Sequence, residues 1–141
     1  MALSFFIIYN LRQVIVEIDN SFPLEAPLQA NELAHAVVDV VANKKAANLL
    51  MLDMRQITLL ADYYVLCDGT SKRQMDAITE GLLEALKKEG THAAVVEGTP
   101  ESGWMLIDFG SVIVHVFSPE KRAYYQLEEL WKEAPVVVRM L

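Results

Sequence analysis

The sequence predicts a single domain of the α/β (α+β) class, in which helices cover one mixed β-sheet of about five strands. Three observations support this prediction. Stretches with helical and strand-like periodicity alternate along the chain, and turn-forming residues separate them. The composition, with 53% hydrophobic and 22% charged residues, is typical of a globular protein. The length of 141 residues is enough for one substantial core.

The first predicted elements are a helix and two strands. The stretch 22–27 contains two prolines and marks a boundary, after which apolar residues recur at helical spacing over residues 28–45. Residues 48–54 and 62–67 are apolar and rich in strand-favouring side chains, so each stretch predicts a strand.

A long second helix is predicted after the second strand. Ser71 and Gln74 have the spacing of a capping box, in which each side chain satisfies a free backbone N–H group near the helix start. Gly90 is suited to end the helix, because glycine adopts the left-handed conformation without strain. Residues 93–96 then predict a short third strand.

The stretch 103–117 predicts a β-hairpin. Gly110 and Ser111 form a turn-type dipeptide between two apolar runs rich in β-branched residues. If these two residues are the loop, Asp108 and His115 become diagonal neighbours, about 7–8 Å apart at the backbone. Because side chains alternate across a strand, one face of the hairpin holds Trp104, Leu106, Asp108, Ile113, His115 and Phe117.

One continuous helix is predicted over residues 119–133, and a last short strand over residues 136–138. Ser118 followed by a proline is a strong helix start, and a second proline follows the expected end. Helical spacing places Leu127 and Leu130 on the same face of this helix.

The first 26 residues form an N-terminal extension of the domain, which is predicted over residues 27–141. The apolar runs at residues 5–8 and 14–18 are too short, or too interrupted by charges, to span a bilayer, and no signal-peptide pattern accompanies them. Three roles are open for the extension: an added edge strand, an oligomer contact, or no role in the fold. Because no Arg-rich, acid-poor presequence is visible, we expect a cytoplasmic protein.

The formal net charge of −7 restricts the kind of partner. Direct recognition of nucleic acid depends on Lys and Arg neutralising phosphates, so it is not expected of this chain. An acidic protein is better suited to a basic protein partner, because complementary charge steers the encounter. The single cysteine, Cys67, excludes an internal disulfide and a cysteine-based zinc site.

Few residues are arranged for catalysis. Asp108 and His115 fit an acid–base pair with Cys67 as nucleophile, but a polar pair on a sheet and a small buried cysteine are the favoured interpretations. Gly69 and Ser71 fit a phosphate-binding turn, although a tight turn with a helix cap is the simpler interpretation. The histidines lack carboxylates or cysteines at metal-ligand spacing, so neither a metal nor another cofactor is expected.

Two stretches of the sequence resemble the motifs of a known family. Residues 61–71 are similar to its first motif, and residues 103–117 together with 122–131 are similar to its second. The family is that of the ribosome-silencing factors, or iojap-like proteins. The resemblance implies a non-enzymatic protein that binds the large ribosomal subunit through ribosomal protein uL14 and blocks joining of the small subunit. A homodimer is compatible with this role.

The resemblance also indicates which residues contact the partner. We expect Trp104 to be the apolar anchor of the contact, because buried aromatic residues carry much of the binding energy of protein interfaces. The predicted uL14-contacting patch consists of Trp104, Leu106, Asp108, Arg122, Tyr125, Leu127 and Glu128.

The family's fold is similar to that of nucleotidyltransferases, which gives an alternative prediction of a nucleotide-binding or nucleotide-transferring enzyme. Gly69 and Ser71 approximate the turn of such enzymes, with Asp108 and His115 on the neighbouring strands. A site for two metal ions requires paired carboxylates, whereas Asp108 is the lone acid of its strand. The sequence therefore favours a binding protein over an enzyme.

Overall fold

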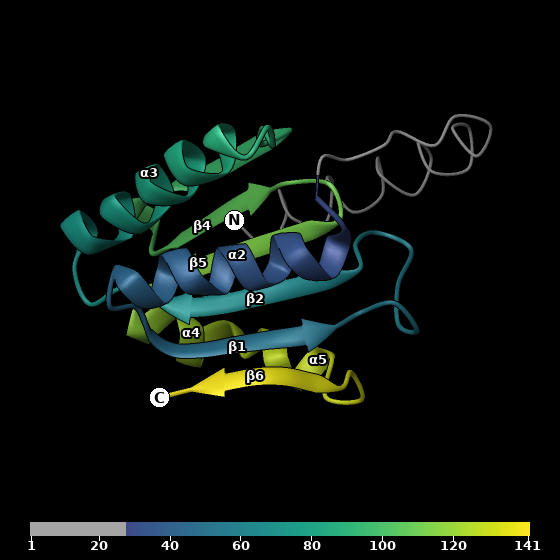
Figure 1. Cartoon of the computed structure of the whole chain (residues 1–141). Coiled ribbons are helices and arrows are strands. Elements are labelled where there is room, and N and C mark those ends of the chain that lie inside the picture. The colour runs from purple at the N-terminus through teal and green to yellow at the C-terminus, as the bar shows by residue number, and fades with distance from the viewer. Residues whose placement is uncertain (1–27) are drawn as a thin grey trace.

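A six-stranded mixed sheet runs through residues 28–141, the part of the chain that the computed structural model describes (Figure 1). The strand order is β3-β4-β5-β2-β1-β6, and only the neighbours β2 and β5 are parallel. The predicted α+β domain with one mixed sheet is confirmed, with six strands instead of about five. In chain order the elements are α2 (Ala30–Asn43), β1 (Ala47–Asp53), β2 (Tyr63–Asp68), α3 (Lys72–Lys88), β3 (Val95–Thr99), the 3-10 helix η1 (Pro100–Ser102), β4 (Trp104–Asp108), β5 (Val112–Phe117), α4 (Pro119–Tyr125), α5 (Leu127–Leu130) and β6 (Val136–Met140).

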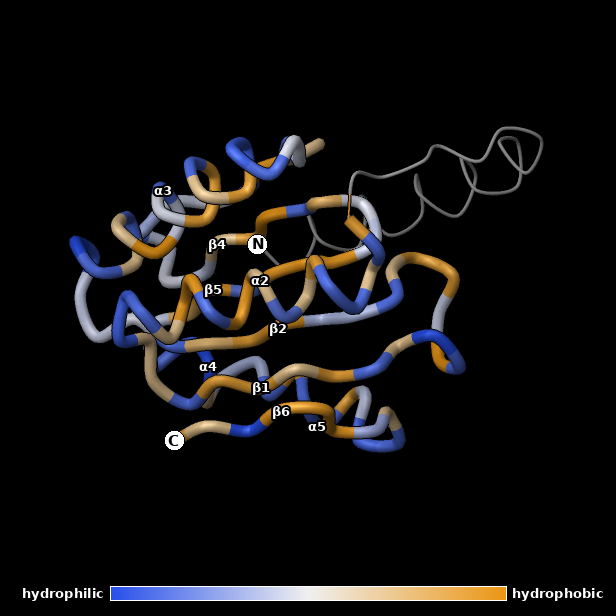
Figure 2. Tube along the Cα trace, viewed as in Figure 1, coloured by the Kyte–Doolittle hydropathy of each residue, from blue (hydrophilic) through white to orange (hydrophobic). Residues whose placement is uncertain are grey.

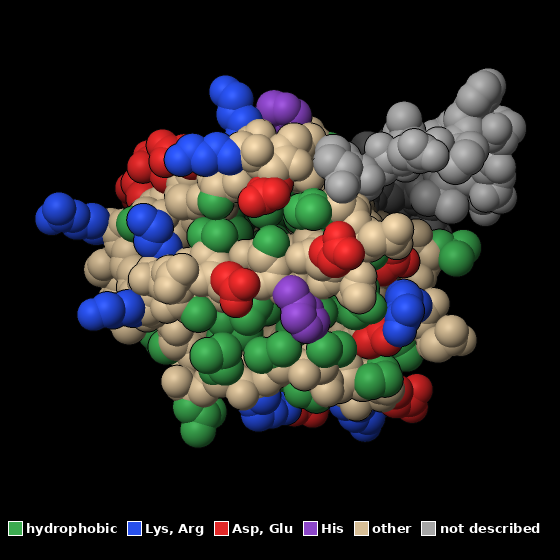
Figure 3. Space-filling model, in the orientation of Figure 1, with side chains coloured by type: hydrophobic (Ala, Val, Ile, Leu, Met, Phe, Trp, Pro, Cys, Tyr) green, Lys and Arg blue, Asp and Glu red, His purple; other side chains and the backbone are tan. Residues whose placement is uncertain are grey.

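Two long helices, α2 and α3, cover one face of the sheet (Figure 1). Hydrophobic residues recur along α2 and fill the central strands, as Figure 2 shows. Their helical spacing buries Leu33, Val37 and Val41 of α2 against the core. The outer surface of this layer carries acidic and basic side chains around small hydrophobic patches (Figure 3). Among residues 28–141, no helix is long and apolar enough to cross a membrane.

The start of α3 differs in one detail from the predicted capping box. Ser71 Oγ accepts a hydrogen bond from the N–H of Gln74 at 3.0 Å, as predicted. The Gln74 side chain, however, accepts from the N–H of Thr70 at 2.7 Å, and its amide donates to the carbonyl oxygens of Lys44 and Lys45 at 3.2 and 3.0 Å. Gln74 therefore joins the start of α3 to the end of α2.

The predicted hairpin is formed by β4 and β5, with the predicted register. Trp104 lies opposite Phe117, Leu106 opposite His115, and Asp108 opposite Ile113. Gly110 has φ 93°, which a residue with a side chain rarely adopts. We call the side of β4 and β5 that holds the predicted six residues the hairpin face: Trp104, Leu106, Asp108, Ile113, His115 and Phe117.

The predicted continuous helix over residues 119–133 is wrong. The chain breaks at Gln126, whose φ of 46° and ψ of 50° are left-handed, so that α4 ends at Tyr125 and α5 is a single turn. The break turns Leu127 into the core at 5% exposure, whereas Leu130 points outward and is 71% exposed. The prediction that both leucines share one helix face is therefore wrong.

Candidate functional site

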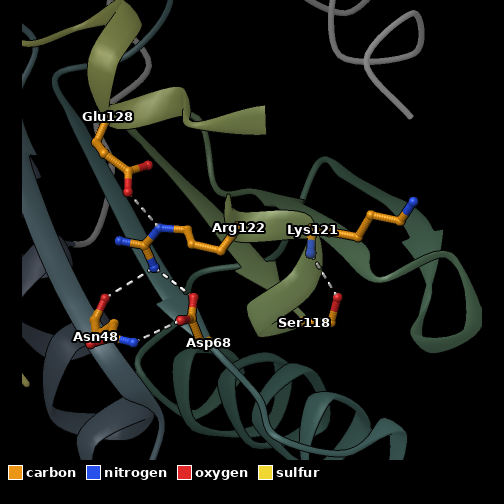
Figure 4. Close-up of polar contacts among 6 residues, drawn as sticks. All are labelled: Asn48, Asp68, Ser118, Lys121, Arg122 and Glu128. Atoms are coloured by element: carbon orange, nitrogen blue, oxygen red, sulfur yellow. Dashed lines mark hydrogen bonds and ion pairs between the residues drawn. The ribbon is translucent and has the colours of Figure 1, made fainter. Parts of the chain in front are cut away.

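A polar cluster joins four elements at the end of β2 (Figure 4). Arg122 of α4 donates from Nη1 to Oδ1 of Asp68 at 2.7 Å and to the carbonyl oxygen of Asn48 at 3.0 Å. Its Nε donates to Oε1 of Glu128 at 3.1 Å, and Asn48 Nδ2 donates to Oδ2 of Asp68 at 3.0 Å. We call these four residues the Arg122 cluster.

The ion pair at the centre of the Arg122 cluster is largely buried, so the cluster has a structural role. The side chains of Arg122 and Asp68 are only 11% and 3% exposed. A buried ion pair must be fully hydrogen-bonded to offset its desolvation, and each partner here makes two or more such bonds. Because Arg122 and Glu128 lie on α4 and α5, the cluster joins both short helices to the start of β1 and the end of β2.

A small pocket adjoins the Arg122 cluster on the side of β6. Its volume is about 200 Å³, below the range of about 300–1,000 Å³ typical of pockets for small-molecule ligands. A second pocket, of about 260 Å³, lies at the turn that holds Gly69 and Ser71 and is also below that range. Neither pocket therefore has the size expected of a nucleotide site.

Aromatic rings pack over the hairpin face beside the cluster. The Trp104 ring stacks on Phe117 with centroids 5.0 Å apart, and Tyr125 of α4 covers Trp104 at 4.7 Å. Trp131 packs edge-on against Tyr64 of β2, also at 4.7 Å. Tyr125 and Trp131 thus add aromatic contacts between the α4–α5 region and the sheet, and both remain partly exposed.

His115 lies within this aromatic group as a neutral side chain. Burial, with a smaller contribution from the positive charge of Arg122, lowers the pKa of His115 from 6.5 to about 3. Its Nδ1 accepts a hydrogen bond from Trp104 Nε1–H at 3.1 Å, so the neutral ring carries its proton on Nε2. His115 therefore fixes the orientation of the Trp104 indole.

The residues of the predicted uL14-contacting patch differ in exposure: four are buried and three are partly exposed. Trp104, Leu106 and Asp108 are each 1% exposed, and Leu127 is 5% exposed, so these four do not form accessible surface in this structure. Alternation along the strand predicts correctly which face they share, but it does not reveal that this face is covered. Asp108 also has a local role, because its Oδ1 accepts a hydrogen bond from the N–H of Gly110 at 2.8 Å. The residues that keep partial exposure are Arg122, Tyr125 and Glu128.

Two strongly exposed apolar side chains lie on the same two short helices as those three residues. Tyr124 is 74% exposed and packs edge-on against Tyr125, with ring centroids 4.9 Å apart. Leu130 of α5 is 71% exposed. Large apolar side chains next to charged groups are typical of protein-binding surfaces. We call this region the α4–α5 surface: Arg122, Tyr124, Tyr125, Glu128 and Leu130.

The residues of the alternative enzyme prediction do not form one site. Ser71 follows the end of β2 at which Asp68 pairs with Phe117, whereas Asp108 is level with Ile113 and Tyr64. Tyr64 and Asp68 are four residues apart, which is about 13 Å along a strand. The hydroxyl of Ser71 is moreover engaged as the cap of α3.

The other candidates for catalysis and metal binding find no support in the structure. Cys67 is fully buried, and burial raises the pKa of its thiol to about 12, so the reactive thiolate is disfavoured. Within residues 28–141, no three His, Cys, Asp or Glu side chains are grouped so as to hold a metal ion.

Residues 28–141 thus form a small α+β domain in which two short helices are joined to β1 and β2 by a partly buried polar cluster. Comparison with known proteins identifies the family: the model described as "Ribosomal silencing factor during starvation" matches residues 27–140. The chain belongs to this family.

Relatives of known sequence agree with this assignment. "Ribosomal silencing factor RsfS" of Halalkalibacterium halodurans is 42% identical over 106 residues, which cover 75% of this chain and 91% of the relative. The protein of the same name from Bacillus subtilis is 42% identical over 94 residues, covering 67% of this chain and 80% of the relative. "Protein Iojap, chloroplastic" of Zea mays is 32% identical over 113 residues, which cover 79% of this chain and 49% of the relative.

Solved structures show the same fold. A crystal structure of a protein from Chromobacterium violaceum superposes with a TM-score of 0.72 at 30% identity, covering 74% of this chain and 88% of the other. A second crystal structure, from Bacillus halodurans, has a TM-score of 0.68 at 39% identity. The match covers 77% of this chain and 98% of the other.

Proposed function

We propose that this protein acts in the cytoplasm as a ribosomal silencing factor, binding the large ribosomal subunit through ribosomal protein uL14 and preventing the small subunit from joining. Membership of the ribosomal silencing factor family supports the proposal. A domain held on the joining face excludes the other subunit by its volume, so no bond needs to be made or broken. Translation then falls because fewer complete ribosomes form.

Charge supports a protein partner on the ribosome in preference to naked RNA. The net charge of −7 repels phosphates and attracts a basic protein surface. Steering of this kind depends on ionic strength, so association with the large subunit is expected to slow as salt is raised.

The observation that carries the proposed contact is the exposed α4–α5 surface. Tyr124 and Leu130 are more than two-thirds exposed, and they lie on α4 and α5, the helices that also carry Arg122 and Glu128. We assign the first contact with uL14 to this surface. The remaining residues of the predicted patch, Trp104, Leu106, Asp108 and Leu127, are proposed to belong to the same binding region, beneath and next to it.

Titration of purified uL14 with variants of the α4–α5 surface tests this assignment. Leu130→Ala is expected to weaken binding about tenfold or more, since loss of an interface hot spot costs about 2 kcal/mol. Val96→Ala is the matched control, because Val96 is 44% exposed on β3 at the opposite edge of the sheet. Equal affinities of the two variants would refute the assignment.

We further propose that the free protein forms a homodimer through β6. This strand is at the edge of the sheet, and its Val136, Val137 and Met140 are 44–48% exposed. An apolar edge strand with unpaired backbone groups is a template for pairing with a second copy. Val137→Lys should shift the sedimentation of the free protein toward the monomer, and an unchanged sedimentation coefficient would exclude this contact.

A further inference from the structure

The positive charges of this acidic chain are distributed unevenly. Five of its twelve Lys and Arg residues lie where α2 ends and α3 begins, or at the start of α4. Figure 3 shows Lys and Arg side chains projecting from this end of the molecule, on the left of the view. Four of the five residues are exposed and the fifth is partly exposed. We call this region the basic end: Lys44, Lys45, Lys72, Arg73 and Lys121.

Contacts between the helices bring these residues together. The side-chain amide of Gln74 donates to the carbonyl oxygens of Lys44 and Lys45 at 3.2 and 3.0 Å, which holds the end of α2 against the start of α3. Lys72 and Lys121 line the same pocket, of about 260 Å³, between the starts of α3 and α4. The basic end is therefore one continuous surface, although it comes from three parts of the chain.

The cations of the basic end are not neutralised within the described part of the chain. None of them forms an ion pair with another residue of 28–141. Glu101 and Glu120 line the pocket, and Asp76 lies one turn along α3, but these acids also form no ion pair with the basic end. The five positive charges are thus available to an anion from outside the molecule.

The start of α3 departs from the usual charge preference of helices. The N-terminus of a helix carries a partial positive charge, so acidic residues are favoured in the first turn and cations are not. In α3 the first turn holds Lys72 and Arg73 and no acid. Neither side chain makes a hydrogen bond to another described residue that would offset this repulsion. A local preference that is broken without a structural gain indicates a functional position.

The basic end adjoins the surface that we assign to uL14. Lys121 Nζ lies 5.5 Å from the ring centroid of Tyr124, a member of the α4–α5 surface. Figure 4 shows the Lys121 side chain extending away from the Arg122 cluster. A partner that is seated on the α4–α5 surface therefore has its own surroundings next to the basic end.

We propose that the basic end binds the phosphate backbone of ribosomal RNA beside uL14 on the large subunit. This inference rests on the proposed function, because the contact with uL14 brings the basic end to the RNA. The net charge of −7 keeps the affinity for free RNA low, which is why the overall composition does not indicate this contact. Once uL14 is bound, the second contact forms at high effective concentration, so even weak phosphate contacts strengthen the attachment.

Binding of RNA extracted from large subunits tests the basic end without uL14. In about 50 mM salt, Lys72→Gln with Arg73→Gln should bind this RNA about tenfold more weakly than the wild type. The slope of log affinity against log salt should become shallower by about 1.4–1.8, as expected for two lost phosphate contacts.

Lys87→Gln with Lys88→Gln is the matched control, because it removes two exposed cations from the last turn of the same helix. Glutamine is a helix former comparable to lysine and arginine, so both variants should fold. The control should bind the RNA as the wild type does. Equal affinities of the two variants, or no binding by the wild type, would overturn the proposal.

Large subunits and isolated uL14 separate this proposal from the proposed function. The Lys72→Gln, Arg73→Gln protein should bind uL14 as tightly as the control, but large subunits about tenfold more weakly. Equal binding of the two variants to large subunits would overturn the contact with RNA on the ribosome. Weaker binding to isolated uL14 would assign these residues to the protein contact instead. If the wild type binds the RNA as expected but neither uL14 nor large subunits, the proposed function fails while the phosphate-binding surface stands.

Discussion

Replacement of Arg122 by methionine is the perturbation whose size follows most directly from the structure. Methionine has a similar length, but it leaves Asp68 buried at 3% side-chain exposure without a counter-charge, and it removes the hydrogen bonds to Asn48 and Glu128. Removing one partner of a buried ion pair typically costs about 3–5 kcal/mol. We expect the free energy of unfolding, measured by urea titration, to fall by that amount, with the midpoint shifted and the slope unchanged.

The same substitution at Arg55 provides the control. Arg55 also forms a 2.7 Å ion pair, with Asp53, but its side chain is 58% exposed. Exposed pairs contribute about 0–1 kcal/mol, so Arg55→Met should have little effect. In the double variant Arg122→Met with Asp68→Leu, part of the lost stability should return, because no buried charge then stands alone. If Arg122→Met lowers the free energy of unfolding by less than about 1 kcal/mol, the inference that the Arg122 cluster holds α4 and α5 on the sheet is refuted.

Three further predictions concern other parts of the fold. The pKa of His115 is about 3 in the folded protein and 6.5 in the unfolded chain, so between these values only the unfolded chain binds the proton. Stability should therefore fall by up to about 1.4 kcal/mol per pH unit as the pH drops from 6.5 towards 3, and His115→Gln should flatten that part of the measured pH profile. Gln74→Ala should lower the thermal midpoint by several degrees, as expected for a loss of about 1–2 kcal/mol, because it removes the bonds that join α3 to Lys44 and Lys45. Gly103→Ala should destabilise by more than 1 kcal/mol in urea titration, since its φ is 77° and a Cβ there would lie 2.5 Å from Lys121 Cγ.

The hairpin shows what the sequence could predict, and why. Its register depends on a local turn and on strict alternation, so the partners of Trp104, Leu106 and Asp108 follow once Gly110 and Ser111 are placed in the loop. The helix cap at Ser71 is equally local. Features that depend on a few neighbouring residues were therefore predicted correctly.

The candidate site depended on contacts that no local pattern reveals. Arg122 and Asp68 are 54 positions apart and meet only because β2 and the start of α4 lie at the same end of the sheet. The break at Gln126 occurs without a glycine or proline, and it separates Leu130 from the helix face predicted to hold Leu127 as well. The 74% exposure of Tyr124 likewise depends on how α4 packs and not on a local sequence pattern.

Exposure was the property least accessible from the sequence. The same strand pattern that placed Trp104 and Leu106 on one face is compatible with a core or with a docking surface, because both are apolar. The structure resolves this for the described state, in which both side chains are buried. Their proposed contact with uL14 consequently requires the hairpin face to open.

Sedimentation of recombined ribosomal subunits tests the central claim most directly. Separated large and small subunits are mixed in magnesium-containing buffer with and without this protein, and the gradient fractions are analysed for complete ribosomes and for bound protein. We predict fewer complete ribosomes, with the protein sedimenting on free large subunits and absent from small ones. An undiminished yield of complete ribosomes, at protein concentrations in excess of the subunits, would contradict the proposed silencing function.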